Sequence, residues 1–268
     1  MLTLYVSCLR AAHIKMTPIP LPERRLVVAS YNIHKGLSPL NRHLVLHDVR
    51  QALNQLAPDF VFLQEVQGAH LQHARRFATW QDAQHEYLAG DLLHYAYGKN
   101  AHYHLGHHGN AFLSRHPIAS WHNFDLTLHR FEQRGVLHCK VEVAGWDSPL
   151  HALCVHLNLR AGDRRKQLAM MVEYIRRHIP DNEPLVLAGD FNDWRGELSP
   201  FLRDQLAMME AFETMHGSPA RSFPVRFPLL TLDRVYVRGF AIVRAEVLTG
   251  SPWRNLSDHA PLYTVLQG

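Results

Sequence analysis

Short apolar segments that each end in a carboxylate, an amide or an imidazole recur along this chain. The clearest is LVLAGDFND, residues 185–193, in which a strand of buried character leads directly into Asp190, Asn192 and Asp193. An unpaired carboxylate is costly to bury, so a strand end of this kind is expected to face a cation or a reacting group. The pattern predicts a rigid sheet scaffold that carries its chemistry at the ends of strands.

The same kinds of polar side chain stand near the ends of five other apolar segments: Asn32, Glu65, His156, Asp233, and the adjacent Asp258 and His259. A cap or a buried histidine bonded to a carbonyl would explain any one of them alone. Six such positions on separate strands are harder to explain singly, and they favour one shared site.

Segments of strand character alternate with segments of helical spacing. Apolar residues recur every three or four positions in 43–56 and 164–179, which predicts two helices. Strands are expected at 25–33, 59–66, 135–145, 149–158, 184–190, 229–239 and 259–267, and the segment 109–118 has strand character that Pro117 breaks. The mixture of hairpins and strand–helix units predicts an α/β protein with mixed sheets and helices outside them.

The chain is long enough for one sizeable domain, which we expect to span residues 25–268. Residues 1–24 are expected to be an N-terminal extension, either disordered or the product of an upstream start, with Met16 as an internal alternative. The opening segment MLTLYVSCL does not favour a secretory signal, because it is too short and no basic residues precede it. No run reaches the length of a membrane span.

Charge and cysteine content limit the choice of partner and compartment. The net charge of +4 permits a polyanionic partner without requiring one, and no long basic run is present. The three cysteines form no CxxC pair, which favours a reducing compartment and predicts a cytoplasmic protein. Cys139 and Cys154 are expected to be buried thiols. Separately, the protein is expected to be a monomer.

The polar residues at the strand ends suit hydrolysis of a phosphoester. That reaction needs a deprotonated water, a cation that neutralises the phosphate, and assistance to the departing oxygen. Carboxylate and amide oxygens without cysteine ligands favour a hard ion, Mg²⁺ or Mn²⁺.

Six motifs occur in an order that resembles the endonuclease/exonuclease/phosphatase superfamily: SYNIHKG, FLQEV, VHLN, GDFND, LDRVYV and SDHAPL. The resemblance covers roughly residues 25–267. Members of that superfamily include pancreatic-type deoxyribonuclease, abasic-site nucleases, sphingomyelinases and inositol polyphosphate 5-phosphatases. The resemblance implies a four-layer α/β sandwich of two packed mixed sheets flanked by helices.

Metal ligands follow from the resemblance, position by position. It implies that Glu65 is the principal ligand of the metal, with Asn32 beside it. Asp258 is expected to lie close to the metal, directly or through water.

Catalytic roles follow in the same way. The resemblance implies that Asp190 orients and deprotonates the attacking water, and that Asn192 holds that water or a phosphate oxygen. His259 would contact the scissile phosphate, and Asp233 would fix its tautomer. His156 would bind the phosphate or protonate the leaving oxygen.

Some features depart from the superfamily pattern or stay open. His34 stands where some abasic-site nucleases have a carboxylate, and Arg134 is either a phosphate contact or, as we favour, a solvated arginine. Trp194 and Trp253 follow or precede the motifs closely and are expected to wall a substrate cleft. The histidines of segment 101–112 could hold zinc, face the substrate from a loop, or simply be exposed: His102, His104, His107 and His108.

The sequence therefore predicts a Mg²⁺- or Mn²⁺-dependent phosphoester hydrolase, a phosphodiesterase of nuclease-like character. Two alternatives remain: the same chemistry on a lipid headgroup or another small phosphoester, and a catalytically inactive protein that only binds. The second is disfavoured because an inactive relative would be expected to lack at least one of the motif residues.

Overall fold

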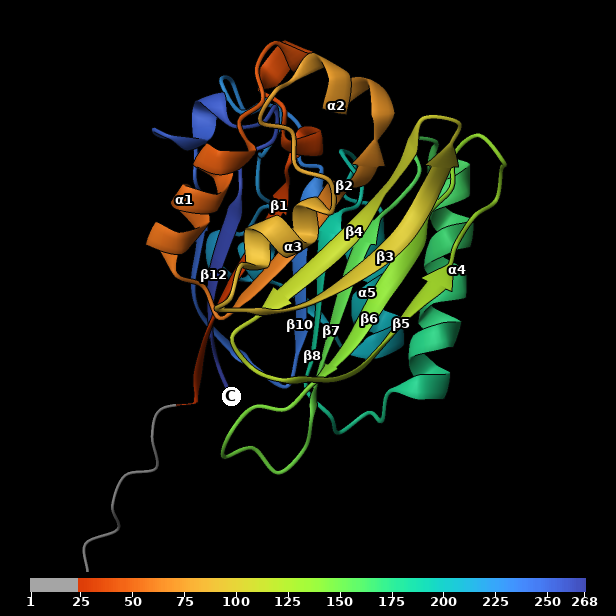
Figure 1. Cartoon of the computed structure of the whole chain (residues 1–268). Helices are drawn as coiled ribbons and strands as arrows, with labels where there is room; N and C mark the ends of the chain where they lie inside the picture. The colour runs from red at the N-terminus through yellow and green to blue at the C-terminus, as the bar shows by residue number, and fades with distance from the viewer. Residues whose placement is uncertain (1–23) are drawn as a thin grey trace, which may run out of the picture.

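Two six-stranded β-sheets lie face to face in the computed structural model, which describes residues 24–268 (Figure 1). The first sheet has the strand order β11-β12-β1-β2-β4-β3, and the second has the order β5-β6-β7-β8-β10-β9. Pairs β1/β2 and β7/β8 are parallel and the other pairs are antiparallel, so both sheets are mixed. The strands are β1 Arg25–Asn32, β2 Phe60–His70, β3 His94–Tyr103, β4 Gly106–Ser114, β5 Ile118–Asp125, β6 Gly135–Val141, β7 Leu150–His156, β8 Leu185–Asp190, β9 Met209–Glu210, β10 Asp233–Arg238, β11 Ala241–Val247 and β12 Leu262–Gln267.

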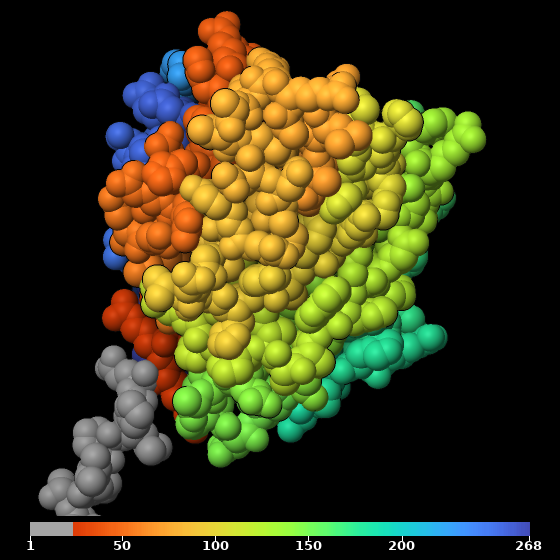
Figure 2. Space-filling view, in the orientation of Figure 1, coloured from red at the N-terminus to blue at the C-terminus, as the bar shows by residue number. Residues whose placement is uncertain are grey.

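Helices cover the outer faces of both sheets (Figure 1). The α-helices are α1 Leu46–Leu56, α2 Leu71–Arg76, α3 Gln84–Ala89, α4 Ala161–His178, α5 Leu198–Leu206 and α6 Ala211–His216. Short 3₁₀ helices occupy His34–Gly36, Pro39–Asn41 and Trp253–Asn255. In the same orientation, the space-filling view shows the α2–β3 segment over the middle of the near surface, with the α1 region to its left and the following strands below and to its right (Figure 2).

Three apolar clusters account for the layered arrangement. One lies between the sheets and includes Phe62 and Phe112, whose ring centroids are 5.0 Å apart. A second joins α1 and α3 to the first sheet, and a third joins α4 and α5 to the second. Burying both faces of each sheet gives helix, sheet, sheet and helix layers, so the expected four-layer α/β sandwich is confirmed.

The strand-like segment 109–118, which Pro117 was expected to break, is divided between the two sheets. Strand β4 ends at Ser114, and β5 begins at Ile118 in the other sheet. Pro117 lies in the crossing segment, where its missing N–H interrupts no ladder. The expected break at Pro117 is confirmed, and it coincides with a change of sheet.

The parallel strand pairs bring the expected site residues to one place. Asn32 ends β1 and Glu65 lies in the neighbouring β2, while His156 and Asp190 end the adjacent β7 and β8. His156 is paired in register with Asp190, and Asp190 is paired with Asp233 at the start of β10. These strand ends of the two sheets meet where Asn32 contacts Asp190.

Cys139 and Cys154 are free, buried thiols, as expected. Residues 1–23, with Cys8, Met16 and nearly all of the expected extension, lie outside the described residues. Within residues 24–268, no helix combines the length and the apolar character that crossing a bilayer requires.

Candidate active site

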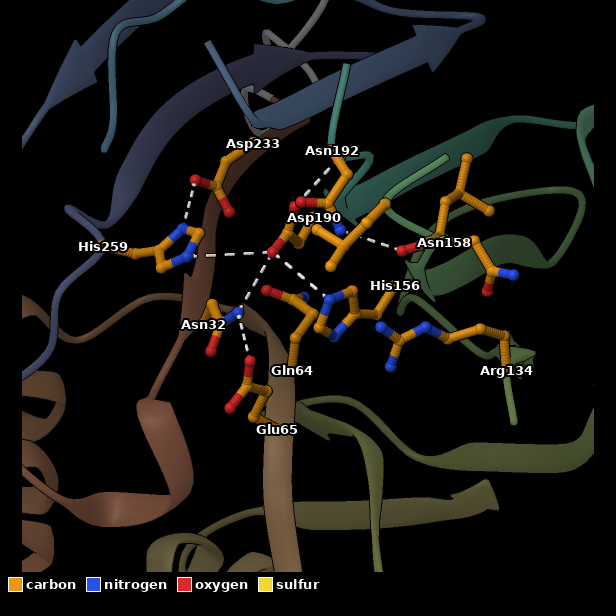
Figure 3. A network of polar contacts seen from close by, with 12 residues as sticks. Asn32, Gln64, Glu65, Arg134, His156, Asn158, Asp190, Asn192, Asp233 and His259 are labelled. Atoms are coloured by element: carbon orange, nitrogen blue, oxygen red, sulfur yellow. Dashed lines mark hydrogen bonds and ion pairs between the residues drawn. The ribbon is translucent and has the colours of Figure 1, made fainter. Parts of the chain in front are cut away.

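One carboxylate oxygen, Oδ2 of Asp190, is the point on which the polar side chains converge (Figure 3). It accepts a hydrogen bond of 3.1 Å from Asn32 Nδ2. It also lies 3.4 Å from His156 Nε2 and 3.8 Å from His259 Nε2. The structure thus brings together side chains from β1, β7, β8 and the loop before β12 around a single oxygen.

Asp190 is held by its own neighbour in the chain. The backbone N–H of Asn192 donates to Asp190 Oδ1 at 3.0 Å, and the Asn192 side-chain N–H donates to the carbonyl of Leu157 at 2.9 Å. Asn192 has a positive φ of 52°, a conformation in which asparagine is more frequent than most residues. Its Oδ1 remains able to accept from a water or from a ligand.

His259 lies between two carboxylates. Its Nδ1 is 2.8 Å from Asp233 Oδ2, while its Nε2 faces Asp190 (Figure 3). The Ser222 hydroxyl also donates to Asp233 Oδ2, and the backbone N–H of His259 donates to Ser257 Oγ. The imidazole is therefore fixed in orientation from both ends.

Glu65 occupies a strained backbone position in β2, with φ at 56°. Its Oε1 accepts from Asn32 Nδ2 at 3.3 Å, and its Oε2 lies 3.2 Å from the Lys35 ammonium. Burial opposes ionisation of this carboxyl, but the charge of Lys35 holds the pKa of Glu65 below its usual range. The Glu65 side chain is therefore anionic.

Asp258 pairs with His34, the residue two positions after Asn32. His34 Nδ1 lies 3.2 Å from Asp258 Oδ1. This hydrogen bond raises the pKa of His34. Burial works against the charge on Asp258, but the same contact with His34 and the charge of His259 hold its pKa below the usual value.

The environment drives the pKa values of the central groups apart. Burial, and then the charge of Asp233, raise the pKa of Asp190 to about 7. Burial opposes the charged form of His259, yet Asp233 and Asp190 raise its pKa to about 10. Burial, with Arg134 second, lowers the pKa of His156 well below its usual range. Near neutral pH the site therefore pairs a cationic His259 with a neutral His156 and an Asp190 poised to titrate.

These residues open into a cleft of about 520 Å³. Glu65, His156, Asp190, Asn192 and His259 line it, and so do Lys35, His108, Arg134 and Trp194. Asp258 lies outside this lining, in the wall of a neighbouring pocket.

Sequence reasoning missed Lys35, which lines the cleft. Lys35 lies in SYNIHKG, three residues after Asn32, so its nearness to a motif was the available signal. His108 lies on β4 and lines the cleft, in the histidine-rich segment for which a substrate-facing position was one alternative, and burial lowers its pKa to about 4.

Arg134 and the tryptophans require corrections. The Arg134 side chain is 14% exposed, pairs with Glu132 at 3.2 Å and lines the cleft, so the preference for a solvated arginine was wrong. Trp194 lines the cleft as expected. Trp253 is 8% exposed and packs edge-on against Tyr31, so its expected place in the cleft wall was wrong.

The donor set fits a hard divalent cation. Glu65 Oε2 is buried and accepts no hydrogen bond of good geometry from the described residues, and the positive group that faces it is the Lys35 ammonium. Asn32 contacts the other Glu65 oxygen, so a carboxylate and an amide are already adjacent. Oxygen donors of this kind suit Mg²⁺ or Mn²⁺.

A second group of potential ligands consists of Asp190, Asp233 and His259, whose ligand atoms lie within 4.8 Å of one another. Because Nδ1 of His259 is bonded to Asp233 and the imidazole is cationic, this group is better suited to proton chemistry than to holding an ion. Within residues 24–268, the histidines of segment 101–112 do not bring three ligand atoms as close together as this second group does.

Comparison with known proteins agrees with this geometry. The chain is 46% identical over 237 residues to the uncharacterized protein YbhP of Escherichia coli K12, covering 88% of this chain and 93% of that protein. Two solved structures share the fold. An endonuclease/exonuclease/phosphatase from Beutenbergia cavernae has a TM-score of 0.72 at 20% identity, covering 91% of this chain and 72% of the other.

The second is D. rerio TDP2 complexed with a single-strand DNA product, with a TM-score of 0.67 at 16% identity, covering 91% and 99% of the two chains. The family profile described as Endonuclease/Exonuclease/phosphatase family matches residues 29–259, which include every expected site residue. The chain therefore belongs to the endonuclease/exonuclease/phosphatase family.

Proposed function

We propose that this protein is a divalent-metal-dependent phosphodiesterase that works by in-line attack of water on phosphorus. The observation that carries the proposal is the convergence of Asn32, His156 and His259 on Asp190 Oδ2. Membership of a family of phosphoester-cleaving enzymes agrees with it.

Asp190 is the group best suited to deprotonate the water. Its pKa of about 7 lets it be ionised and yet basic enough to accept a proton near neutral pH. The Asn192 N–H fixes one of its oxygens, so the other is directed toward the cleft residues. The water oxygen forms a bond to phosphorus while its proton passes to Asp190.

His259 is suited to stabilise the phosphate as charge accumulates on it. The contact with Asp233 keeps the imidazole cationic and oriented. As the P–O ester bond breaks, the departing alkoxide takes up a proton from the imidazolium of His259 or from water. His156, being neutral, has one N–H to donate to a phosphate oxygen or to Asp190.

Glu65 and Asn32 would hold the divalent ion, with Asp258 as the further carboxylate near them. An ion bound there supplies positive charge that offsets the charge of the phosphate. The strained Glu65 backbone supports this role, since such strain concentrates at functional positions.

The substrate class has two candidates. The DNA product in the D. rerio TDP2 structure makes a nucleic-acid diester one of them, but at 16% identity only the fold carries over. A lipid headgroup or other small phosphodiester is the other. The complete set of motif residues argues against a catalytically inactive binding protein.

An activity panel tests the proposal. The purified protein is assayed on bis-p-nitrophenyl phosphate, plasmid and single-stranded DNA, abasic duplex and phospholipid, each with Mg²⁺, Mn²⁺ or EDTA. We expect turnover of at least one diester with metal and none with EDTA. Turnover that EDTA leaves unchanged, or silence on every substrate without metal binding, would contradict it.

A further inference from the structure

Large, exposed apolar side chains line the cleft at four positions, and two more stand within three residues of one of them in the chain. We call them the rim: Phe131, Leu159, Trp194, Phe227, Leu229 and Leu230. They come from the loop after β5, the loop after β7, the loop after β8 and the segment before β10. Phe131, Leu159, Trp194 and Leu230 line the same cleft as Asp190.

This exposure is concentrated rather than scattered. The six most exposed large apolar side chains of the described residues are Phe131 at 86%, Leu92 at 82%, Phe227 at 77%, Leu40 at 74%, Leu229 at 68% and Leu159 at 60%. Four of these six belong to the rim, and Leu92 and Leu40 do not. Single exposed apolar residues need no explanation, but a cluster around a cleft marks a binding surface.

Each rim loop also carries an exposed arginine directly beside an exposed apolar residue. The pairs are Arg130–Phe131, Leu159–Arg160, Trp194–Arg195 and Arg226–Phe227. The guanidinium of Arg130 lies 4.5 Å from the centroid of the Phe131 ring. A surface that alternates apolar side chains with cations suits the boundary between acyl chains and anionic headgroups.

Trp194 is held in place rather than free. The buried guanidinium of Arg164 lies 4.8 Å from the centroid of its ring. A fixed tryptophan at the mouth of a cleft is typical of an interfacial anchor, because the indole has an apolar body and a polar N–H.

We propose that the rim seats the cleft on an anionic lipid surface and that the substrate is a phosphodiester of a phospholipid headgroup. This inference rests on the proposed function and names its substrate class. Apolar rim residues enter the headgroup region, the neighbouring arginines bind lipid phosphates, and the cleft receives one headgroup with Asp190 at its wall.

Single-stranded nucleic acid is the competing occupant, and the composition of the rim disfavours it. Unstacked bases are bound by aromatic faces, whereas three of the six rim residues are leucines, which offer no such face. Leucines exposed to this extent suit contact with acyl chains.

Vesicle binding tests the inference without depending on turnover. The Asp190→Asn protein is sedimented with vesicles of equal parts phosphatidylcholine and phosphatidylglycerol, and separately with phosphatidylcholine alone. We expect binding to the mixed vesicles and weaker binding to the neutral ones. Phe131→Ser/Phe227→Ser in the same background should lower the partition coefficient at least about tenfold, since both side chains lose apolar contact.

Leu92→Ser is the matched control for Leu159→Ser. Leu92 lies just before β3, at the end of the sheet away from Glu65. At that end the first residue of β3 is in register with Ser114, which is itself in register with Phe60 at the start of β2. Leu92→Ser should bind vesicles like the parent, and Leu159→Ser should bind less.

Three results would overturn the inference. The first is absence of binding to mixed vesicles, and the second is equal binding by the rim variants and Leu92→Ser. The third is that the protein binds a single-stranded oligonucleotide and not vesicles, and that the rim variants lose this oligonucleotide binding. Hydrolysis of bis-p-nitrophenyl phosphate by the wild type reports separately on the proposed function, so the two failures are distinguishable.

Discussion

Asp233 lies 2.8 Å from Nδ1 of His259, and the contact leaves the opposite ring nitrogen facing Asp190. This relationship makes the imidazole a fixed cation at the wall of the cleft. It links a residue at the start of β10 with one in the loop before β12, 26 positions apart in the chain.

Asp233→Asn should lower the pKa of His259 from about 10 toward its ordinary value, because the largest charge that raises it is removed. We expect the turnover number to fall about 10²- to 10⁴-fold. Imidazole ¹⁵N chemical shifts measured against pH report the titration directly. Asp204→Asn, at an exposed position, is the matched control, and an unchanged His259 titration in the Asp233 variant would refute the assignment.

Activity should follow a bell-shaped pH profile. Asp190 must be ionised to accept a proton, so kcat/KM is expected to fall as the pH drops below about 7. His259 must stay protonated, so kcat/KM is expected to fall again as the pH rises through about 10. Asp190 and His259 interact, so the pKa values read from the two sides of the profile belong to the pair and not to either residue alone. Profiles on a soluble diester at saturating Mg²⁺ check this, and a rate that rises continuously past pH 10 would contradict it.

Glu65→Gln should weaken metal binding at least about tenfold, because the amide removes an anionic ligand. Mn²⁺ titration followed by electron paramagnetic resonance measures this without requiring turnover. Glu246→Gln, on β11 with its side chain 43% exposed, should bind Mn²⁺ like the wild type. If Glu65→Gln and Glu246→Gln gave the same Mn²⁺ affinity, Glu65 could not be the principal ligand.

Phe62→Ala should destabilise the fold by about 3–5 kcal/mol, because it opens a cavity between the two sheets. Phe131→Ala removes the same side chain from an exposed rim position, so its effect on stability should stay within about 0.5 kcal/mol. Urea denaturation of both variants measures the difference. Similar losses for the two would mean that Phe62 is not a core residue.

The sequence was most informative where a strand is buried and carries one polar residue at its end. Asp190 and His156 belong to central strands whose apolar composition stands out, and the family motifs fixed their order. The four-layer arrangement followed from the same motifs. Composition and periodicity alone indicated only mixed sheets with helices outside.

Strand β3 was not predicted, because its sequence HYAYGKNAHY mixes histidine, lysine and glycine with its tyrosines. As an edge strand it buries little of its length, so its apolar alternation is weak. The same limit applies to cleft residues such as Lys35 and Arg134, which lie in short connections where no periodicity marks the direction of a side chain.

Trp194 and Trp253 illustrate what proximity in sequence cannot decide. Both lie close to catalytic motifs, yet Trp194 lines the cleft and Trp253 packs into the cluster beneath α1. Their different environments depend on the path of the loops in three dimensions, which neither residue type nor spacing specifies.

The central claim is that Asp190 activates water for phosphodiester hydrolysis, and the Asp190→Asn variant tests it most directly. The substitution preserves shape and removes the base, so kcat on the best diester of the panel should fall at least about 10³-fold at saturating Mg²⁺, with circular dichroism and thermal stability retained. Asp147→Asn, at a fully exposed carboxylate, should keep wild-type turnover. Near-normal turnover by a folded Asp190→Asn protein would contradict the account.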